Sequence, residues 1–203
     1  MSSTNLFCPL CKTPNPPTAD ICSGCGEPVA GGRDTRLGSV INDRYRIERQ
    51  LGVGGMGVVY LAQQESLGRD CVLKLLNKGV TDDPANAKRF KREAEMAAKV
   101  WHPNAVQIYD YDILANGSAY IAMEYIDGRP LSRVIKDEYP FDTKRIVSIL
   151  GQLCDVLAVG HNLSMVHRDL KPDNIMLKDL PTKRDFVKLL DFGLAKQVDG
   201  HQT

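Results

Sequence analysis

One ordered string of residues constrains this chain more than any other feature. It reads His167-Arg168-Asp169-Leu170-Lys171-Pro172-Asp173-Asn174 and is followed, after the strand-like run 186–190, by Asp191-Phe192-Gly193. The carboxylate of Asp169 can accept the proton of an attacking hydroxyl, while Asn174 and Asp191 supply the oxygen ligands that Mg²⁺ prefers. Two such motifs in this order rarely arise by chance. They indicate a site for Mg²⁺-assisted phosphoryl transfer.

These motifs resemble the catalytic loop and the metal-binding segment of the bacterial, eukaryotic-like Ser/Thr protein kinases. The resemblance implies that Asp169 is the catalytic base and that Asn174 and Asp191 bind Mg²⁺. Lys171, two residues after the base, is implied to lie near the transferring phosphate, and this spacing favours Ser or Thr over Tyr as the acceptor. The expected activity is transfer of the ATP γ-phosphate to protein hydroxyls.

Two further residues of the string have a role implied by the resemblance. His167 is expected to be structural and to pack behind Phe192, so we do not count it as a general base. Arg168 is suited to pairing with a phosphorylated activation loop, because a guanidinium binds phosphate well. A structural ion pair is the alternative for Arg168.

A glycine-rich loop should lie upstream in this family, and residues 52–59 match it. Glycine lets backbone N–H groups approach phosphate oxygens where a Cβ would obstruct them. The loop joins the strand-like runs 45–51 and 58–62, so it is a hairpin and not the strand-to-helix turn of a dinucleotide fold. A hairpin without ligand is the alternative. The loop residues implied to bind ATP are Gly52, Val53, Gly54, Gly55, Met56, Gly57 and Val59.

The next expected part is a lysine that contacts the nucleotide phosphates and pairs with a helix glutamate. Lys74 ends the apolar run 71–74, and a helix is predicted over about 84–100. At 100° per residue Glu95 lies about 200° from Glu93, so only Glu93 shares the apolar face and is assigned the ion pair. That face is predicted to contain Phe90, Ala94, Ala97, Ala98 and Trp101. The opposite side, with Lys88, Arg92 and Lys99, is predicted to be solvated, and a docking site for a phosphorylated loop is the alternative.

The adenine pocket departs from the family at Val72, where alanine is usual. The two extra methyl groups predict a tighter pocket, since overpacking costs about 1–3 kcal/mol. The run 119–123 is expected to be a strand that leads into the hinge. Adenine is implied to contact Val72, the gatekeeper Met123, backbone groups of Glu124 and Ile126, and Met176, which also fits an ordinary core position.

A long helix, 143–163, is predicted before the catalytic loop. Its inner stripe is predicted to be Ile146, Leu150, Leu153 and Leu157. Cys71 and Cys154 lie in apolar runs and are predicted to be core thiols.

Near the N-terminus stand two CxxC pairs, Cys8 with Cys11 and Cys22 with Cys25. Four thiolates in this arrangement predict one tetrahedral Zn²⁺ site and resemble a zinc ribbon. Two disulfides are the alternative, but the absence of a signal peptide and the expected need for ATP favour reduced thiols and a cytoplasmic location. Lys12 is the one basic residue before Arg33, which argues against nucleic acid and favours a protein partner.

Composition adds boundaries to this picture. A net charge of +1 and 43% hydrophobic residues fit an ordinary soluble protein, and no apolar run reaches the ~20 residues of a membrane helix. The predicted fold class is α+β, a bilobal kinase-like fold preceded by a small zinc ribbon. The predicted domains are a zinc ribbon (1–27), a linker (28–39), a complete small lobe with hinge (40–126) and the first part of the large lobe (127–203).

The sequence stops ten residues after Gly193, before any Ala-Pro-Glu motif. We therefore expect a fragment of a longer kinase, since an isolated module has no evident need for the full set of catalytic residues. The alternative is a non-catalytic ATP-binding or interaction module. A small-molecule phosphotransferase of kinase-like fold is disfavoured by the glycine loop and the Asp-Phe-Gly string.

Overall fold

The computed structural model describes residues 6–8, 13–16, 19, 22, 29, 34, 36–54, 57–76, 83–115 and 117–192. It contains two compact units, residues 1–88 with 110–122 and residues 89–109 with 123–203. Predictions about Cys11, Cys25, Gly55, Met56 and Gly193, and about half of the predicted linker, lie outside the described residues. At the N-terminus, β1 (Leu6–Phe7) pairs antiparallel with β2 (Pro14–Asn15).

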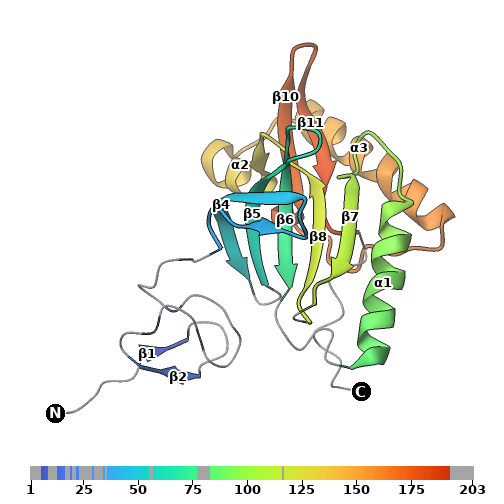
Figure 1. Cartoon of the computed structure of the whole chain (residues 1–203). Coiled ribbons are helices and arrows are strands. Elements are labelled where there is room, and N and C mark those ends of the chain that lie inside the picture. Colours follow the sequence, from blue (N-terminus) through green and yellow to red (C-terminus); the bar gives the residue numbers. More distant parts are fainter. Residues whose placement is uncertain are drawn as a thin grey trace. The chain divides into compact units, whose positions relative to one another are not determined.

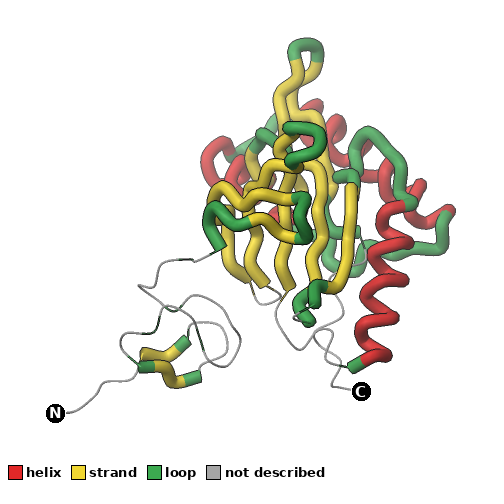
Figure 2. The backbone as a smooth tube through the Cα atoms, viewed as in Figure 1, coloured by secondary structure: helices red, strands yellow, loops and turns green. Residues whose placement is uncertain are grey.

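A six-stranded sheet forms most of the first unit (Figures 1 and 2). Its strands are ordered β3-β4-β5-β6-β8-β7. Their bounds are β3 (Val40–Ile41), β4 (Tyr45–Gly54), β5 (Gly57–Gln64), β6 (Arg69–Leu76), β7 (Ile108–Ile113) and β8 (Ala119–Glu124). Alternate residues of β5 and β6 are fully buried, among them Tyr60, Cys71 and Leu73. This period of two places one side of these strands in the core. The predicted strands and the hairpin between β4 and β5 are confirmed.

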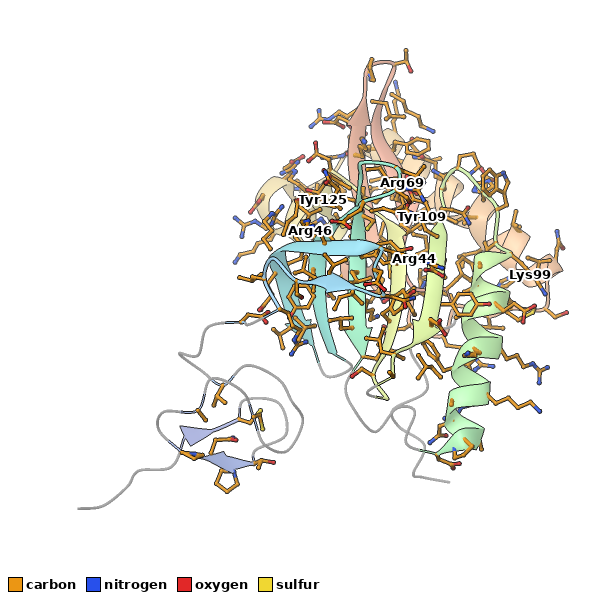
Figure 3. All side chains as sticks on the ribbon, in the orientation of Figure 1. Arg44, Arg46, Arg69, Lys99, Tyr109 and Tyr125 are labelled. Carbon is orange, nitrogen blue, oxygen red and sulfur yellow. The ribbon has the colours of Figure 1, made fainter. Side chains whose placement is uncertain are left out.

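A polar cluster lies among the strands of this sheet. The carboxylate Oδ2 of Asp110 accepts hydrogen bonds from the hydroxyls of Tyr45 (3.1 Å) and Tyr120 (2.8 Å) and from Nη1 of Arg44 (3.1 Å). Burial, together with the nearby carboxylate, raises the pKa of Tyr120 to about 12. Arg44 carries the exposed end of the cluster (Figure 3). Both tyrosines therefore stay protonated and act as donors at any physiological pH.

Residues from the predicted linker contact the same sheet. The hydroxyl of Tyr60 donates to Oδ2 of Asp34 at 2.6 Å, and the guanidinium of Arg36 lies 5.8 Å from the centre of the Tyr60 ring. The backbone of Gly38 also donates to the carbonyl of Ile47 at 2.8 Å. The later part of the segment 28–39 is therefore tied to the β-sheet.

Helix α1 (Pro84–Ala98) begins where Oδ1 of Asp83 accepts the N–H of Ala85 at 2.9 Å, with Pro84 in the first turn. Phe90, Ala94 and Ala97 are buried as predicted. Trp101 is 79% exposed, so its assignment to the buried face is wrong. The helix ends before Trp101, and helical spacing no longer decides where that side chain points.

The predicted solvated side of α1 is confirmed, because Lys88, Arg92 and Lys99 are exposed. Glu95 pairs with Lys99 at 3.5 Å, and both side chains are exposed. Lys99 lies just past the end of the helix (Figure 3). Ala98 is half-buried, in partial agreement with its predicted place.

The second unit contains two further helices and a three-stranded sheet of order β11-β10-β9. The elements are β9 (Arg129–Pro130), α2 (Leu131–Glu138), α3 (Thr143–Asn162), a 3₁₀ turn (Pro172–Asn174), β10 (Ile175–Leu180) and β11 (Lys183–Leu189). Oδ1 of Asp142 caps α3 by accepting the N–H of Arg145 at 2.7 Å. Val156, Val187 and Leu189 belong to the core that α3 forms with β11.

The predicted inner stripe of α3 is confirmed for Leu153 and Leu157, which pack in the core, and is wrong for Ile146 and Leu150. Ile146 and Leu150 are 42% and 53% exposed, whereas Ile149, Leu153 and Val156 are buried. The error arises because α3 carries apolar residues on two sides, and the period alone does not say which side meets the core. Leu153 was placed correctly and Leu157 is half-buried.

Of the two predicted core thiols, Cys71 is fully buried and Cys154, on α3, is exposed. Burial raises the pKa of the Cys71 thiol to about 11. The prediction for Cys154 is therefore wrong, for the same reason as the α3 stripe. Across the part of the chain that the structure describes, no helix is long and apolar enough to cross a bilayer.

Candidate active site

The catalytic loop gathers three of the predicted side chains. Oδ2 of Asp169 accepts hydrogen bonds from Nζ of Lys171 and from Nδ2 of Asn174, each at 2.8 Å. Nδ2 of Asn174 also donates to the backbone carbonyl of Asp169 at 2.8 Å. The Lys171 ammonium, followed by the Asn174 amide, holds the pKa of Asp169 below its usual range. Asp169 is thus an ionised carboxylate at neutral pH, as a base must be.

Backbone bonds connect this loop to the segment that carries Asp191. The N–H of Leu190 donates to the carbonyl of Asn174 at 2.9 Å, and Nε2 of His167 lies 2.8 Å from the carbonyl of Leu190. The ring of His167 meets that of Phe192 edge-on at 5.1 Å, so the predicted packing is confirmed. Since a carbonyl only accepts, Nε2 of this histidine must carry the proton. The loop that carries Asn174 and the segment that carries Asp191 therefore belong to one hydrogen-bonded network, and these two residues are the predicted Mg²⁺ ligands.

Phe192 is also held from the α3 side. Gly160 lies so close that a Cβ there would come within 2.3 Å of Cε1 of Phe192. Sequence analysis did not single out Gly160, although a glycine inside a long helix is a signal of close approach.

In the first unit, strand register brings together the predicted nucleotide residues of β5 and β6. Val59 is paired with Lys74, and Leu61 with Val72. These residues project from the side opposite the buried Cys71 and Leu73. Val59, Val72 and Lys74 therefore share one face of the sheet.

The glycine-rich loop is closed by the pairs Gly52 with Val59, Val53 with Val58 and Gly54 with Gly57. Gly57 has φ +150°, and a Cβ there would lie 1.9 Å from the carbonyl oxygen of Leu75. Nothing lies within 4 Å of a Cβ built on Gly52. Close approach of β6 therefore requires glycine at position 57, a reason that the phosphate interpretation did not contain.

The hinge residues belong to the second unit. The N–H of Glu124 donates to the carbonyl of Gln107 at 2.9 Å, and Oε2 of Glu124 accepts from Nζ of Lys188 at 2.7 Å. Met123 and Ile126 are buried, and Met176 on β10 is half-buried. Lys188 was not predicted to contact the hinge. The available signal was that a lysine stands within the apolar run 186–190, where it needs a polar partner.

Lys74 and Glu93 fall in different units. Glu93 is half-buried on α1. Their ion pair therefore stays a prediction.

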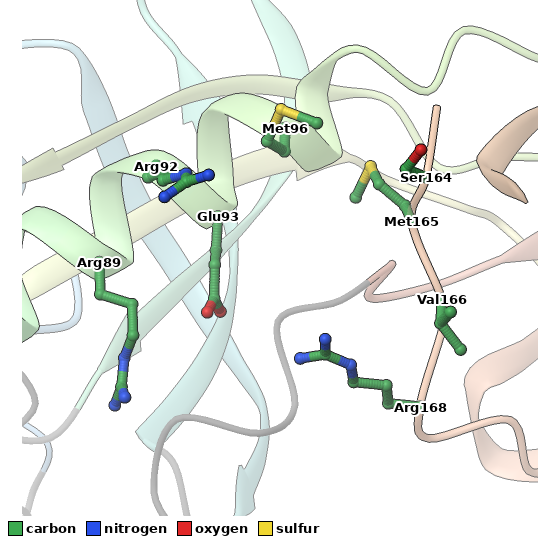
Figure 4. Close-up of a pocket in the computed structure, with 8 residues that line it drawn as sticks. All are labelled: Arg89, Arg92, Glu93, Met96, Ser164, Met165, Val166 and Arg168. Atoms are coloured by element: carbon green, nitrogen blue, oxygen red, sulfur yellow. The ribbon is translucent and has the colours of Figure 1, made fainter. Parts of the chain in front are cut away.

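Three arginines line a pocket of about 320 Å³ in the second unit (Figure 4). Arg89 and Arg92 come from α1, and Arg168 comes from the catalytic loop, where it has φ +66°. Arg92 is exposed, as predicted for the solvated side of α1, and lines the pocket together with Glu93. Such a cluster of guanidinium groups is suited to binding an anion. Arg89 was missed, although its spacing of three from Arg92 was visible.

In the N-terminal segment, Cys8 and Cys22 are buried in one cluster with Val29. Nδ2 of Asn15 donates to Sγ of Cys22 at 3.5 Å, and the N–H of Cys8 donates to the carbonyl of Thr13 at 3.0 Å. Within the described ranges, no group of three or more His, Cys, Asp or Glu residues gathers to hold a metal. Two of the four predicted zinc ligands are outside those ranges.

An ionised carboxylate with lysine and asparagine partners, followed by an Asp-Phe segment, is the arrangement expected of a phosphotransferase site of the kinase type. The family model "Protein kinase domain" matches residues 45–203. The chain belongs to the protein kinase domain family.

Named relatives agree with this assignment. The serine/threonine-protein kinase Pkn3 of Myxococcus xanthus is 40% identical over 166 residues, which are 82% of this chain and 30% of that protein. PknB of Mycobacterium tuberculosis is 37% identical over 163 residues, 79% of this chain and 25% of that protein. The crystal structure of the M. tuberculosis PknI kinase domain is similar at TM-score 0.69 and 30% identity, covering 80% of this chain and 63% of that one. The chain thus spans less than a third of the length of these two curated relatives.

Proposed function

We propose that this chain provides the nucleotide-binding and catalytic parts of a Ser/Thr protein kinase, which transfers the γ-phosphoryl group of ATP to a hydroxyl of a protein. The observation that carries the proposal is the ionised Asp169, held by Lys171 and Asn174 at 2.8 Å. Asp169 accepts the proton of the attacking hydroxyl, and Lys171 can then turn to the charge of the transferring phosphoryl group. The proposed protein substrate follows from the names of the relatives, and the proposed cytoplasmic location follows from the need for ATP.

The fit to Mg²⁺ rests on the donor set. Asn174 and Asp191 offer amide and carboxylate oxygens from one bonded network, and such ligands suit Mg²⁺. Mg²⁺ would neutralise charge on the ATP phosphates. The proposed ATP contacts are the loop 52–59 with Val72 and Lys74, and Met123, Glu124, Ile126 and Met176. Glu93 is proposed to orient Lys74.

The test compares Asp169→Asn with Asp173→Asn in phosphate transfer from labelled ATP to a protein substrate. Asp169→Asn should lower the rate by about 10²–10⁴-fold and leave ATP affinity within a factor of about three, because only the proton acceptor is lost. Asp173, which is exposed and four residues away, serves as the matched control. Equal rates for Asp169→Asn and wild type would overturn the proposal. ATP binding without any transfer by wild type would favour a non-catalytic nucleotide-binding module.

We further propose that Cys8, Cys11, Cys22 and Cys25 bind one Zn²⁺ and that this ribbon docks a protein partner. The support is that one cysteine from each CxxC pair is buried in the same small cluster. Zinc would then stabilise a segment too short to fold on a core of its own. Metal analysis of reduced protein should find about one zinc per chain, with sulfur at about 2.3 Å. Cys22→Ser should lose the metal, whereas Cys154→Ser, an exposed control on α3, should keep it. Zinc-free wild type, or disulfides mapped among the four cysteines, would refute this assignment.

The arginine pocket supports a regulatory role for Arg168, as its place in the catalytic loop suggests. We infer that a phosphate on the activation loop binds Arg89, Arg92 and Arg168. Phosphorylation should then raise activity in wild type and have little effect in Arg89→Ala. Arg133→Ala, which removes an exposed arginine of α2, is the control. An unchanged response in Arg89→Ala would leave these arginines with a structural role alone.

A further inference from the structure

Two buried amide side chains lie along the edge of β11, the strand that leads to Asp191. Asn104 follows α1 in the segment 102–107, and Gln152 lies on α3. Each is 6% exposed. Strand β10 pairs with the other edge of β11. Buried polar groups are unfavourable unless their hydrogen bonds are made, so these two amides call for an explanation.

Their bonds meet the backbone of β11 at one residue. Nδ2 of Asn104 donates to the carbonyl of Val187 at 2.7 Å, and the N–H of Val187 donates to Oε1 of Gln152 at 3.1 Å. Nδ2 of Asn104 also lies 3.1 Å from Oε1 of Gln152. Both backbone groups of Val187 on this edge are therefore satisfied by side chains.

Gln152 uses its amide fully. Besides accepting two bonds, its Nε2 donates to the carbonyls of Ser148 (3.2 Å) and Asp185 (3.0 Å). It thus connects α3, β11 and the segment 102–107. Because every donor and acceptor has a partner, the side chain has one favourable position.

The same segment continues the contact one pair further along β11. The N–H of Leu189 donates to the carbonyl of Asn104 at 2.7 Å, and the N–H of Val106 donates to the carbonyl of Leu189 at 2.9 Å. Nζ of Lys188 reaches the carbonyl of Ala105 at 3.2 Å. Beyond Leu189 the chain passes directly to Leu190, whose N–H binds the carbonyl of Asn174, and then to Asp191.

Packing leaves little free space between the segment 102–107 and the end of β11. The cavity between the segment and the start of the Asp-Phe motif measures about 10 Å³ and is lined by Ala105, Val106, Leu189, Asp191 and Phe192, among others. A space of this size holds one water at most. A shift of the segment along β11 would therefore displace Leu189 and its successors as well.

We propose that Asn104 and Gln152 are positioning residues: by fixing the segment 102–107 in register on β11 they set the place of Asp191 and couple it to the end of α1. The inference rests on the proposed function in one respect, since Asp191 matters as a Mg²⁺ ligand. Neither amide touches a reacting atom. A purely structural role would lower stability alone, whereas a positioning role also alters the metal site of the protein that remains folded.

The first test is amide hydrogen exchange, which needs no activity. Asn104→Asp replaces the donor with an acceptor that faces the carbonyl of Val187, and Gln152→Glu removes the two donors of Nε2. Each should speed exchange at Leu189 and also at Leu190 by about tenfold, the size expected for losing one net hydrogen bond. Asn162→Asp changes an exposed side-chain amide of α3 and is the matched control. It should leave the exchange of the backbone N–H groups of Leu189 and Leu190 unchanged. Asn104→Ser, which keeps a shorter donor, should give a smaller change in the same direction and secures the test where an acidic variant fails to fold. Faster exchange at Leu189 with no change at Leu190 would overturn the proposal.

The second test measures Mn²⁺ binding to protein saturated with a non-hydrolysable ATP analogue, with Mn²⁺ standing in for Mg²⁺. Asn104→Asp and Gln152→Glu should weaken Mn²⁺ binding about threefold to tenfold and leave metal-free nucleotide affinity unchanged. This is less than the ~10–100-fold loss typical for a direct hydrogen-bond partner of a metal ligand, because these amides act on Asp191 through the backbone of β11. Equal Mn²⁺ affinity in variants and wild type would refute positioning. If wild type binds no Mn²⁺ with the nucleotide, the proposed function fails, and the exchange at Leu190 still decides whether the amides hold this segment.

Discussion

The six-stranded sheet and the segment 167–192 place their candidate functional side chains by different physical means. In β5 and β6 the residues Val59, Val72 and Lys74 share a face because of backbone register and the period of two. In the segment 167–192, Asp169 and Asn174 are held by side-chain hydrogen bonds of 2.8 Å. Register is insensitive to most side-chain changes, whereas directional bonds depend on each donor and acceptor. The sheet should therefore tolerate substitution better than the catalytic segment.

Gly57 provides the strongest test of this comparison, because it lies in the sheet, which should tolerate most substitutions. Gly57→Ala should destabilise the protein by about 3 kcal/mol, since a strained φ and a steric clash each cost about 1–3 kcal/mol. The Cβ would lie 1.9 Å from the carbonyl oxygen of Leu75. Chemical denaturation measures the effect, and Gly52→Ala is the control, with a change within about 0.5 kcal/mol. Equal stability of the two variants would mean that β6 moves away readily.

Two glycines of α3 sharpen the comparison on the side of the catalytic segment. Gly160→Ala should cost about 2 kcal/mol because its Cβ would meet the Phe192 ring at 2.3 Å. Gly151→Ala, where nothing lies within 4 Å, should stabilise by about 0.5–1 kcal/mol through helix propensity. Thermal unfolding of both variants checks the sign difference. A gain in stability at position 160 would show that Phe192 is held more loosely than its contacts suggest.

Val72 and its neighbour Cys71 separate the two faces of β6. Val72→Ala should tighten ATP binding by about threefold, measured by calorimetry, because it relieves overpacking on the proposed nucleotide side. Cys71→Ala should instead lower stability and leave affinity unchanged, since the Cys71 side chain is fully buried on the other side. Unchanged or weaker binding in Val72→Ala would contradict the predicted direction of that side chain.

The smallest expected effect concerns an ion network that connects α2 with α3 and lies outside the catalytic loop. The guanidinium of Arg129, and then that of Arg145 at 2.7 Å, holds the pKa of Glu138 at about 2. A lowered folded-state pKa means that the contribution to stability is present above the ordinary pKa of about 4.5 and is lost as pH falls towards 2. Glu138→Gln should therefore flatten the dependence of stability on pH between about 4.5 and 2. An identical slope in wild type and variant would show that water screens the pair completely.

Sequence reasoning succeeded where a motif or a strict period fixes the answer. The strands around the glycine loop and the burial of Phe90 follow from such local patterns, and the packing of His167 on Phe192 follows from the resemblance that the motifs carry. The prediction of the α3 stripe failed in part because α3 has two apolar faces, and tertiary contacts decide which of them is buried. The predicted burial of Trp101 failed because the helix ends before that residue.

Several residues that sequence reasoning missed hold the structure in place and take no part in the chemistry. Asn104 and Gln152 bind main-chain groups of β11, and Gly160 makes room for the ring of Phe192. Because these partners are far apart in the chain, no local sequence pattern indicates that they interact. A single sequence identifies a reacting group more readily than the groups that hold it in place.

The hydrogen bond from the Glu124 N–H to Gln107 has a consequence for base selectivity. Because this donor is already engaged at 2.9 Å, recognition of a base by the Glu124 backbone must use its carbonyl, which can only accept. The exocyclic amino group of adenine is a donor and would satisfy it. The corresponding oxygen of guanine is an acceptor and would face another acceptor, leaving both desolvated and without a partner. A site that includes Glu124 should therefore bind GTP more weakly than ATP, because an acceptor that is buried without a donor costs free energy. This selectivity would come from the backbone alone and would need no side chain.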